Sequence, residues 1–270
     1  MAKFWMVLGA LLSGAAYSAW GQAPAYSAAS VVNASDFSAG PFAPNSVLSI
    51  FGTNLSWDTH ALAGSDIVNN TLPTSLASVQ VYIDNWPVPL IFVSPTQINF
   101  IVPGNEIAGA VPLRVVREGV TGPEVDIQLT GAAPALFDAG GFAIATNPDG
   151  ALLTADAPAL PGNVVVIYAT GLGKTQPNPA PGVVPLTPDP ISALSTLNVY
   201  LNGVAVDPKL IFYGGVTPDC AGLYQINMFL PADTPANPEI RVSVGPQESL
   251  AGILLNVNAQ PLAAGLRSNR

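Results

Sequence analysis

The fold is decided by two stretches of the sequence that read alike, Pro44-Asn45-Ser46-Val47-Leu48-Ser49-Ile50-Phe51-Gly52-Thr53-Asn54-Leu55 and Pro161-Gly162-Asn163-Val164-Val165-Val166-Ile167-Tyr168-Ala169-Thr170-Gly171-Leu172. Each begins with a proline turn, continues as an alternating, mostly apolar run to an aromatic residue, and ends in a threonine and a leucine. Alternation over about four to eight residues is typical of a half-buried β-strand. The sequence therefore predicts the same strand and turn at two places in the chain.

Three further pairs of segments match in the same order. They are Val79–Asn85 with Leu197–Gly203, Leu90–Phe92 with Leu210–Phe212, and Gln97–Pro103 with Gln225–Pro231. Because a fixed order of similar segments is the mark of a repeated structural unit, the chain is predicted to contain an internal duplication.

Each matched block reads as a strand, and turn signals separate the blocks. Asp84-Asn85 and Asn202-Gly203 fall where a two-residue hairpin turn is expected, since both turn residues need a positive φ. Asn147-Pro148-Asp149-Gly150 predicts a further turn. Additional strands are expected at Val111–Arg117, Ile127–Leu129, Phe142–Thr146, Ala151–Thr154, Glu239–Val244 and Ile253–Val257.

Short strands with regular turns, and no long window of helical periodicity, predict an all-β protein built of two tandem immunoglobulin-like β-sandwich domains. The small, proline-containing run Gly131-Ala132-Ala133-Pro134 lies between the repeats. We therefore expect a first domain over residues 22–133, a second over 134–260, and a C-terminal tail over 261–270.

The N-terminus has the pattern of a secretory signal peptide. Lys3 supplies a positive charge, Phe4–Ala19 is an uncharged and mainly apolar run, and Ala19-Trp20-Gly21 offers small residues at the two positions that signal peptidase reads. The apolar run is short for a membrane span of about 20 residues and is interrupted by polar and glycine residues. We expect a signal peptide over residues 1–21, cleavage near Gly21 with Ala25 as a nearby alternative, and a secreted protein at the cell surface, in the periplasm or outside the cell.

Composition narrows the classes of partner. Hydrophobic residues make up 49% of the chain and charged residues only 9%, with a formal net charge of −9. A chain of this charge repels phosphate backbones and anionic membrane surfaces, so nucleic acid is excluded as an expected partner. The single cysteine, Cys220, cannot form an intrachain disulfide; it is either a buried apolar side chain or the source of an intermolecular bond.

Several of these segments resemble a known family. Ser30–Ser35, Ala43–Leu55, Val93–Asn99, Tyr168–Gly173 and Ala221–Asn227 are similar to the Solibacter-type uncharacterised C-terminal domain of exported acidobacterial proteins, and the pattern from Pro161 resembles, more distantly, the IPT/TIG branch of immunoglobulin-like domains. The resemblance implies a surface or secreted β-sandwich module and no known activity. Because this copy follows the expected signal peptide directly, it is expected to act alone or to associate with another chain.

The usual catalytic patterns do not fit. Gly171-Leu172-Gly173-Lys174-Thr175 lacks the earlier glycine of a phosphate-binding loop, since Tyr168 stands there, and the prolines that follow exclude the required helix. His60 is the only histidine, and no nucleophile-elbow motif accompanies it. No cofactor and no metal site are expected. Scattered aspartates leave open a hydrolase with paired carboxylates, although turn chemistry also explains them.

Two long loops occupy the same place in both repeats, Trp57–Ser75 and Lys174–Ala193. The first carries Trp57, Asp58 and His60, and Trp86 lies at a turn in the same half, so these four are the candidate ligand-binding residues. Exposed tryptophan beside polar side chains suits sugar stacking, and plugging of the sandwich ends is the alternative. The Tyr213–Gly222 insertion, absent from the first repeat, makes Tyr213 and Cys220 candidate partner contacts.

The sequence thus favours an exported, non-catalytic β-sandwich module with a structural, adhesive or protein-interaction role at the cell envelope or outside the cell. The first alternative is a carbohydrate-binding module that uses the loop tryptophans, and the second is a glycoside-active hydrolase. The expected partner is an envelope or extracellular protein, a polysaccharide, or further copies of the same chain.

Overall fold

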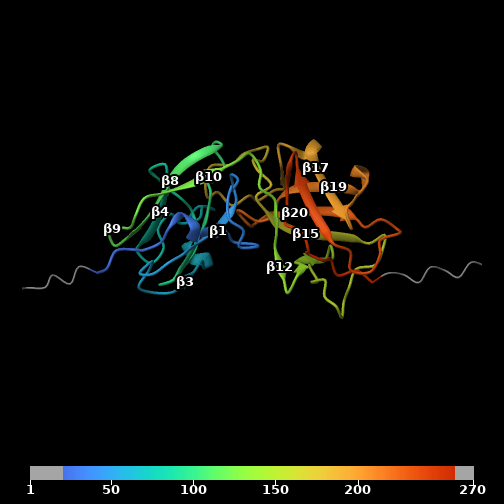
Figure 1. The fold of residues 1–270 in the computed structure, drawn as a ribbon, viewed down its shortest axis with the longest axis horizontal. Coiled ribbons are helices and arrows are strands. Elements are labelled where there is room, and N and C mark those ends of the chain that lie inside the picture. The colour runs from blue at the N-terminus through green and yellow to red at the C-terminus, as the bar shows by residue number, and fades with distance from the viewer. Residues whose placement is uncertain (1–20, 259–270) are drawn as a thin grey trace, which may run out of the picture.

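The computed structural model describes residues 21–258. The expected signal peptide therefore lies outside the described residues except for Gly21, and so do residues 259 and 260 and the expected tail over 261–270. Figure 1 shows the blue-to-green part of the chain and the yellow-to-red part as two bodies side by side along the long axis. Both bodies consist of antiparallel sheets, so the all-β prediction is confirmed.

The first body packs two sheets face to face. One has the order β1 (Val31–Asn33), β2 (Val47–Phe51), β7 (Gln97–Ile101), β6 (Leu90–Val93) and β3 (His60–Ala61). The other has the order β10 (Val125–Leu129), β8 (Gly109–Arg117), β4 (Val79–Ile83) and β5 (Trp86–Pro87), with β9 (Val120–Thr121) paired to β8. The inward residues of both sheets form one buried apolar cluster, as the period-2 pattern requires.

The second body repeats this architecture. One sheet has the order β11 (Ala135–Leu136), β15 (Val164–Thr170), β20 (Tyr224–Phe229), β19 (Ile211–Val216) and β16 (Asp189–Pro190), with β14 (Ala145–Thr146) paired to β15. The other has the order β18 (Val204–Ala205), β17 (Leu197–Leu201), β21 (Ile240–Val244) and β22 (Gln247–Glu248). A separate hairpin joins β12 (Asp138–Ala139) and β13 (Phe142–Ala143).

Short 3₁₀ turns occur in both bodies. The first body contains η1 (Ala28–Ser30) and η2 (Gly64–Asp66), and the second contains η3 (Leu194–Thr196) and η4 (Pro208–Leu210).

The duplication is visible in the strand pairing itself. Val47 lies opposite Ile101 in the first body, and Val164 lies opposite Phe229 in the second, with the following pairs in the same register. Both hairpins predicted from turn residues are present, with positive φ at Asp84 and Asn85 and at Asn202 and Gly203. Three of the four matched sequence blocks therefore occupy equivalent positions in the two sandwiches. In the block Leu90–Phe92 the register makes Ile91 equivalent to Phe212, one residue away from the sequence match with Leu210–Phe212.

Two expected strands are wrong. Ala151–Thr154 forms no strand: Leu152 makes one isolated bridge to Thr146, because a turn closed by hydrogen bonds between Thr154 and Ala157 follows at once. Ile253–Val257 is buried over most of its length and makes only isolated bridges, to Phe142, Glu239 and Ala159. Phe142–Thr146, expected as one strand, is divided between β13 and β14.

Candidate functional site

Trp57 lies on the loop after β2 and is held rigidly against the end of β8. Its indole ring lies over the guanidinium of Arg117, with the Arg117 carbon 3.7 Å from the ring centroid. Its Nε1–H donates a 2.9 Å hydrogen bond to a carboxylate oxygen of Glu118. Because 52% of the residue remains exposed, Trp57 presents a fixed aromatic surface to solvent rather than filling the sandwich.

Arg117, beneath Trp57, is a buried cation that sequence reasoning missed. Only 1% of the residue is exposed, and its Nη groups donate to the backbone carbonyls of Asn54 and, at 2.6 Å, Gln22. Within residues 21–258 no carboxylate lies within ion-pair distance of it. Carbonyl dipoles and the indole face therefore balance the charge, and a cation–π contact is strongest in such a desolvated position.

Asp58 and His60 do not join this arrangement. The Asp58 amide donates to the Ser56 hydroxyl, while His60 Nε2 lies 2.9 Å from a carboxylate oxygen of Asp66. The hydrogen bond with His60 and a second from the Ala63 amide hold the pKa of the Asp66 carboxyl below its usual value. These hydrogen bonds join His60, Ala63 and Asp66 within one loop, so the pair holds the loop around η2 in place.

Trp86 lies away from Trp57. It follows the Asp84-Asn85 turn and pairs with Ile83 at one end of β4, whereas Arg117, under Trp57, pairs with Val79 at the other end. Trp86 is 71% exposed. A strand rises about 3.3 Å per residue, so the two tryptophans belong to opposite ends of the sheet and do not form one continuous platform.

Tyr213 lies within β19, and Cys220 lies in the turn segment that follows this strand. The Tyr213 hydroxyl donates to the Val216 carbonyl at 2.7 Å, and burial raises its pKa to about 12. Cys220 is exposed, so it is not the buried apolar side chain that was one of the two expectations. Desolvation of its thiol by the surrounding chain and, second, the negative charge of Asp219 raise the pKa of the thiol. Neither group is therefore activated for chemistry.

The same segment joins the two bodies. Gly222, at φ +78°, rests directly on Val47 and Ile101 of the first sheet, so close that a Cβ atom there would lie 2.8 Å from a Val47 methyl group. Ala221 and Val184 of the second body also pack into an apolar cluster with Val47, Ile101 and Leu72. The insertion expected as a partner contact thus contacts the other half of its own chain.

Hydrogen bonds reinforce this apolar contact. The Thr170 hydroxyl accepts from the Val47 amide at 3.0 Å and donates to the Gly222 carbonyl at 3.2 Å. Backbone bonds of 2.9 Å join Leu72 to Gly182 and Val184 to Asn70. Buried polar groups paired in this way fix one relative position of the two bodies.

The glycines of the rejected phosphate-loop motif belong to the same junction. Gly171 and Gly173 have positive φ, and the carbonyls of Ala133 and Gly131 in the connecting segment press against them where a side chain would stand. These glycines are therefore required for close backbone approach at the junction.

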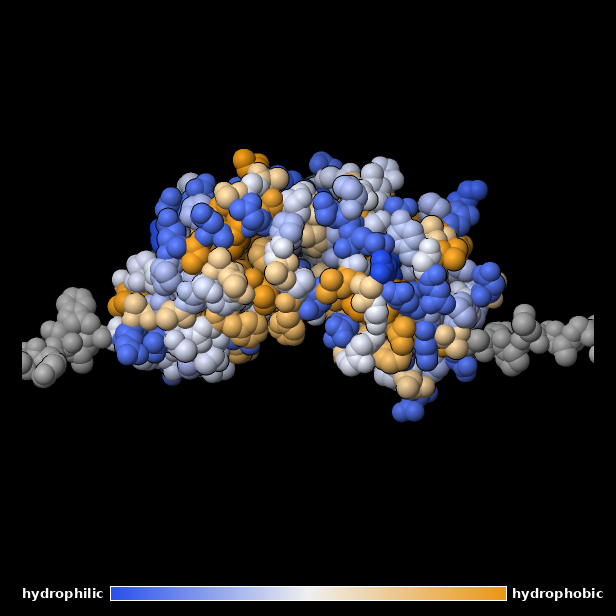
Figure 2. Space-filling view, in the orientation of Figure 1, coloured by the Kyte–Doolittle hydropathy of each residue, from blue (hydrophilic) through white to orange (hydrophobic). Residues whose placement is uncertain are grey.

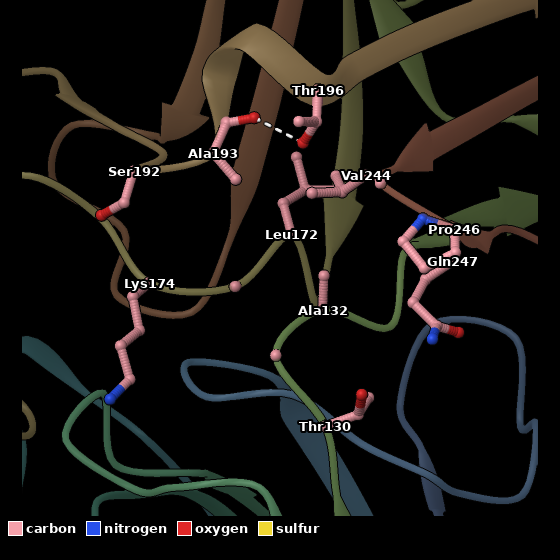
Figure 3. Close-up of a pocket in the computed structure, with 13 residues that line it drawn as sticks. Thr130, Ala132, Leu172, Lys174, Ser192, Ala193, Thr196, Val244, Pro246 and Gln247 are labelled. Atoms are coloured by element: carbon pink, nitrogen blue, oxygen red, sulfur yellow. Dashed lines mark hydrogen bonds between the residues drawn. The ribbon is translucent and has the colours of Figure 1, made fainter.

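A cavity of about 480 Å³ lies beside this junction. In Figure 3 apolar side chains share the lining with the hydroxyls of Thr130, Ser192 and Thr196 and the amide of Gln247, and Lys174 extends away from Thr196 toward the ribbon of the first body. Of its lining residues, Lys174 alone is titratable. In the part of the chain that the structure describes, no group of three or more histidine, cysteine or acidic side chains could hold a metal ion. The lining of the cavity thus combines one amine, a few hydroxyls and one amide with small and apolar side chains.

Comparison with known proteins supports the fold class. Residues 31–130 match the family model of the IPT/TIG domain, so the chain contains an immunoglobulin-like domain of that kind. No curated protein matches the sequence. Over residues 21–258, no helix is long and apolar enough to cross a membrane.

Several solved structures are similar to the chain. One is the surface glycan-binding protein PbSGBP-B from Prevotella bryantii, with 15% identity, coverage of 86% of this chain and 41% of that one, and a TM-score of 0.26. Another is SGBP-B of the mixed-linkage glucan utilization locus of Bacteroides ovatus, with 8% identity, coverage of 81% and 43%, and a TM-score of 0.31. Domains 5–6 of the S-layer protein SbsC follow, with 8% identity, coverage of 88% and 100%, and a TM-score of 0.27. The chain spans less than half the length of the first two.

Proposed function

We propose that this protein is an exported, non-catalytic module that binds other components of the cell envelope or the extracellular matrix as one rigid two-domain unit. The observation that carries the proposal is the junction: an apolar cluster and several hydrogen bonds hold two duplicated sandwiches in a single arrangement. We further propose domain limits of 22–133 and 134–260, with cleavage of a signal peptide near Gly21.

A fixed tandem suits a structural or adhesive role. Domain interfaces that are small and polar allow relative motion, whereas an apolar contact braced by buried hydrogen bonds suppresses it. A rigid unit presents its surfaces at fixed separation and loses little conformational entropy on binding. The resemblance of the sequence to the Solibacter-type family of exported proteins favours the same location.

The test is retention of the purified chain from Gln22 to Arg270 on washed cell envelope and on insoluble polysaccharides, side by side. A protein-binding module is retained on envelope and loses that retention when the envelope is treated with protease. A chain retained on neither material refutes the proposal.

Carbohydrate binding is the second candidate, and Trp57 is the observation that favours it. Its indole is fixed on one face by Arg117 and at its edge by Glu118, while about half of the residue stays exposed. Sugars stack on such pre-positioned aromatic faces. If this function holds, Trp57→Ala abolishes retention on polysaccharide, and free sugar competes the wild type away.

Trp86→Ala is the matched control, because Trp86 is also exposed but lies at the other end of β4. Trp57→Phe keeps an aromatic ring over Arg117 and a stacking face toward solvent, so it should keep polysaccharide binding that Trp57→Ala loses. Equal retention of wild type and Trp57→Ala rules out this platform.

A further inference from the structure

The second domain carries an exposed apolar patch on the outer face of its β15–β20–β19 sheet. Phe212 and Phe229 are 53% and 44% exposed, their ring centroids lie 5.4 Å apart, and Val164 pairs directly with Phe229. We call these three residues the Phe212 patch. Large apolar side chains grouped on a surface mark an interaction site more often than apolar residues scattered singly.

The first domain shows that the equivalent surface is an interface. By strand register, Val47 and Ile101 correspond to Val164 and Phe229. Ile91 is the unpaired residue at the register shift of β6, and Phe212 is the unpaired residue at the register shift of β19, so these two residues also correspond.

All three first-domain residues belong to the apolar cluster covered by the second domain. The duplication therefore places a domain-docking surface on both sandwiches, and within the described chain only the first of the two surfaces has an occupant.

Two of the three strands that carry the patch have no outward-facing charge. The outward residues along β15 and β20 are Val164, Val166, Tyr168, Gln225, Asn227 and Phe229, none of them charged. In a chain of net charge −9, two copies repel each other over most of their surfaces. Along β15 and β20 two copies can meet without that repulsion. Figure 2 shows apolar residues on the surface of the second domain among polar ones.

We propose that the Phe212 patch binds the same patch of a second copy of this chain, forming a two-fold dimer. The proposal rests on the proposed function and names one partner for it. The turn that covers the first-domain surface, with Gly222 at its closest point, is already used inside each chain. The corresponding turn of the first domain is only Ser94–Thr96, between β6 and β7, so a copy cannot repeat that contact head to tail. The self-complementary patch is the matched surface that remains, and two-fold contacts are the commonest in homo-oligomers.

The experiment is sedimentation equilibrium of the purified chain over micromolar concentrations. We expect a monomer–dimer equilibrium for the wild type. Because central aromatic residues dominate most interfaces, Phe212→Ser combined with Phe229→Ser should weaken dimerisation about 100-fold or more. Phe212→Lys, which leaves the second ring in place and sets like charges against each other, should do the same.

The chain offers a matched control in Phe37 and Phe51, whose rings lie 6.0 Å apart on the first domain and which are 62% and 37% exposed. Phe37→Ser combined with Phe51→Ser should leave the dimer intact. A wild type that stays monomeric throughout overturns the proposal, and so does equal dissociation by the control pair.

Mixing the labelled variant chain with wild-type chain distinguishes a two-fold contact from a head-to-tail one. In a two-fold dimer, the labelled Phe212→Ser/Phe229→Ser chain binds wild type weakly, because both partners contribute the same patch. Binding at full wild-type affinity overturns the two-fold arrangement.

Envelope retention, measured on the same preparations, keeps the dimer proposal separate from the proposed binding function. A monomeric wild type that is retained on envelope refutes the dimer alone. A dimer that is not retained refutes the wider binding role alone.

Discussion

The Thr170 hydroxyl is the single group on which the coupling of the two domains can be tested most cleanly. It lies in the second domain, is fully buried, and links the Val47 amide of the first domain to the Gly222 carbonyl of its own. Thr170→Val keeps the shape of the side chain and removes both bonds. The change should therefore destabilise a domain in which no residue has been altered.

The magnitude follows from what is left unpaired. In Thr170→Val the buried Val47 amide loses its acceptor, which costs about 1–3 kcal/mol, and the Gly222 carbonyl loses one donor, which costs less. We therefore expect the free energy of unfolding to fall by about 2 kcal/mol in total. With a urea dependence of about 2 kcal/mol per molar, the midpoint of unfolding should fall by about 1 M. Thr170→Ser keeps both bonds and loses one methyl group, for which about 0.8 kcal/mol is expected.

Tryptophan fluorescence makes the assay specific to one domain. After removal of residues 1–21 the chain contains only Trp57 and Trp86, both in the first domain. Urea titrations followed by fluorescence therefore report on the first domain, while circular dichroism follows both. The coupling is refuted if Thr170→Val shifts the circular dichroism transition and leaves the fluorescence midpoint at the wild-type value.

Three further predictions concern the first domain. Trp57→Ala should lower the free energy of unfolding by about 2 kcal/mol, because it removes a desolvated cation–π contact from Arg117; an unchanged urea midpoint contradicts this. Ser78→Gly should raise the free energy of unfolding by about 1 kcal/mol, because Ser78 has a φ of +60° that costs an L-residue about 1–2 kcal/mol; a lower melting temperature contradicts it. The hydrogen bond with His60 holds the pKa of Asp66 down, so the stability it contributes is complete above the unfolded-state pKa of about 4 and is lost as pH falls through the lower folded-state value. The difference in melting temperature between wild type and Asp66→Asn should therefore shrink in acid, and a constant difference down to pH of about 2 opposes this.

The strands that sequence predicted well are those whose pattern is local. Val164–Thr170 alternates between half-exposed and buried positions over most of its length, so strand and inward face follow from the period of two. Val47–Phe51 has the same inward residues, but Val47 and Ser49 on its outer face are buried as well, which the alternation does not predict. The hairpin turns followed because their residues tolerate positive φ. Ile253–Val257 shows the limit of this reasoning: most of its apolar residues are buried as expected, but a ladder also needs a free neighbouring strand, which the sequence does not reveal.

The candidate site could be predicted only in part for the same reason. Trp57 stood out as a loop tryptophan, but its contact with Arg117 joins residues sixty positions apart. One signal was present, since Arg117 follows Val111, Leu113 and Val115 at an inward position of β8, where a charge is unexpected. The domain junction depends on which sandwich faces meet, and the residues of Tyr213–Gly222 carry no pattern that indicates whether they contact their own chain or another.

The most direct test of a rigid two-domain unit is the distance between the domains in solution. Nitroxide labels on Thr121→Cys of β9 and Asp207→Cys before η4, in a Cys220→Ser background, place one exposed probe on each domain. Pulsed electron paramagnetic resonance should give one narrow distance distribution that matches the docked arrangement, and Thr170→Val should broaden it. A broad distribution in the chain with native Thr170 would contradict the account, because it would show two sandwiches joined by a flexible connection.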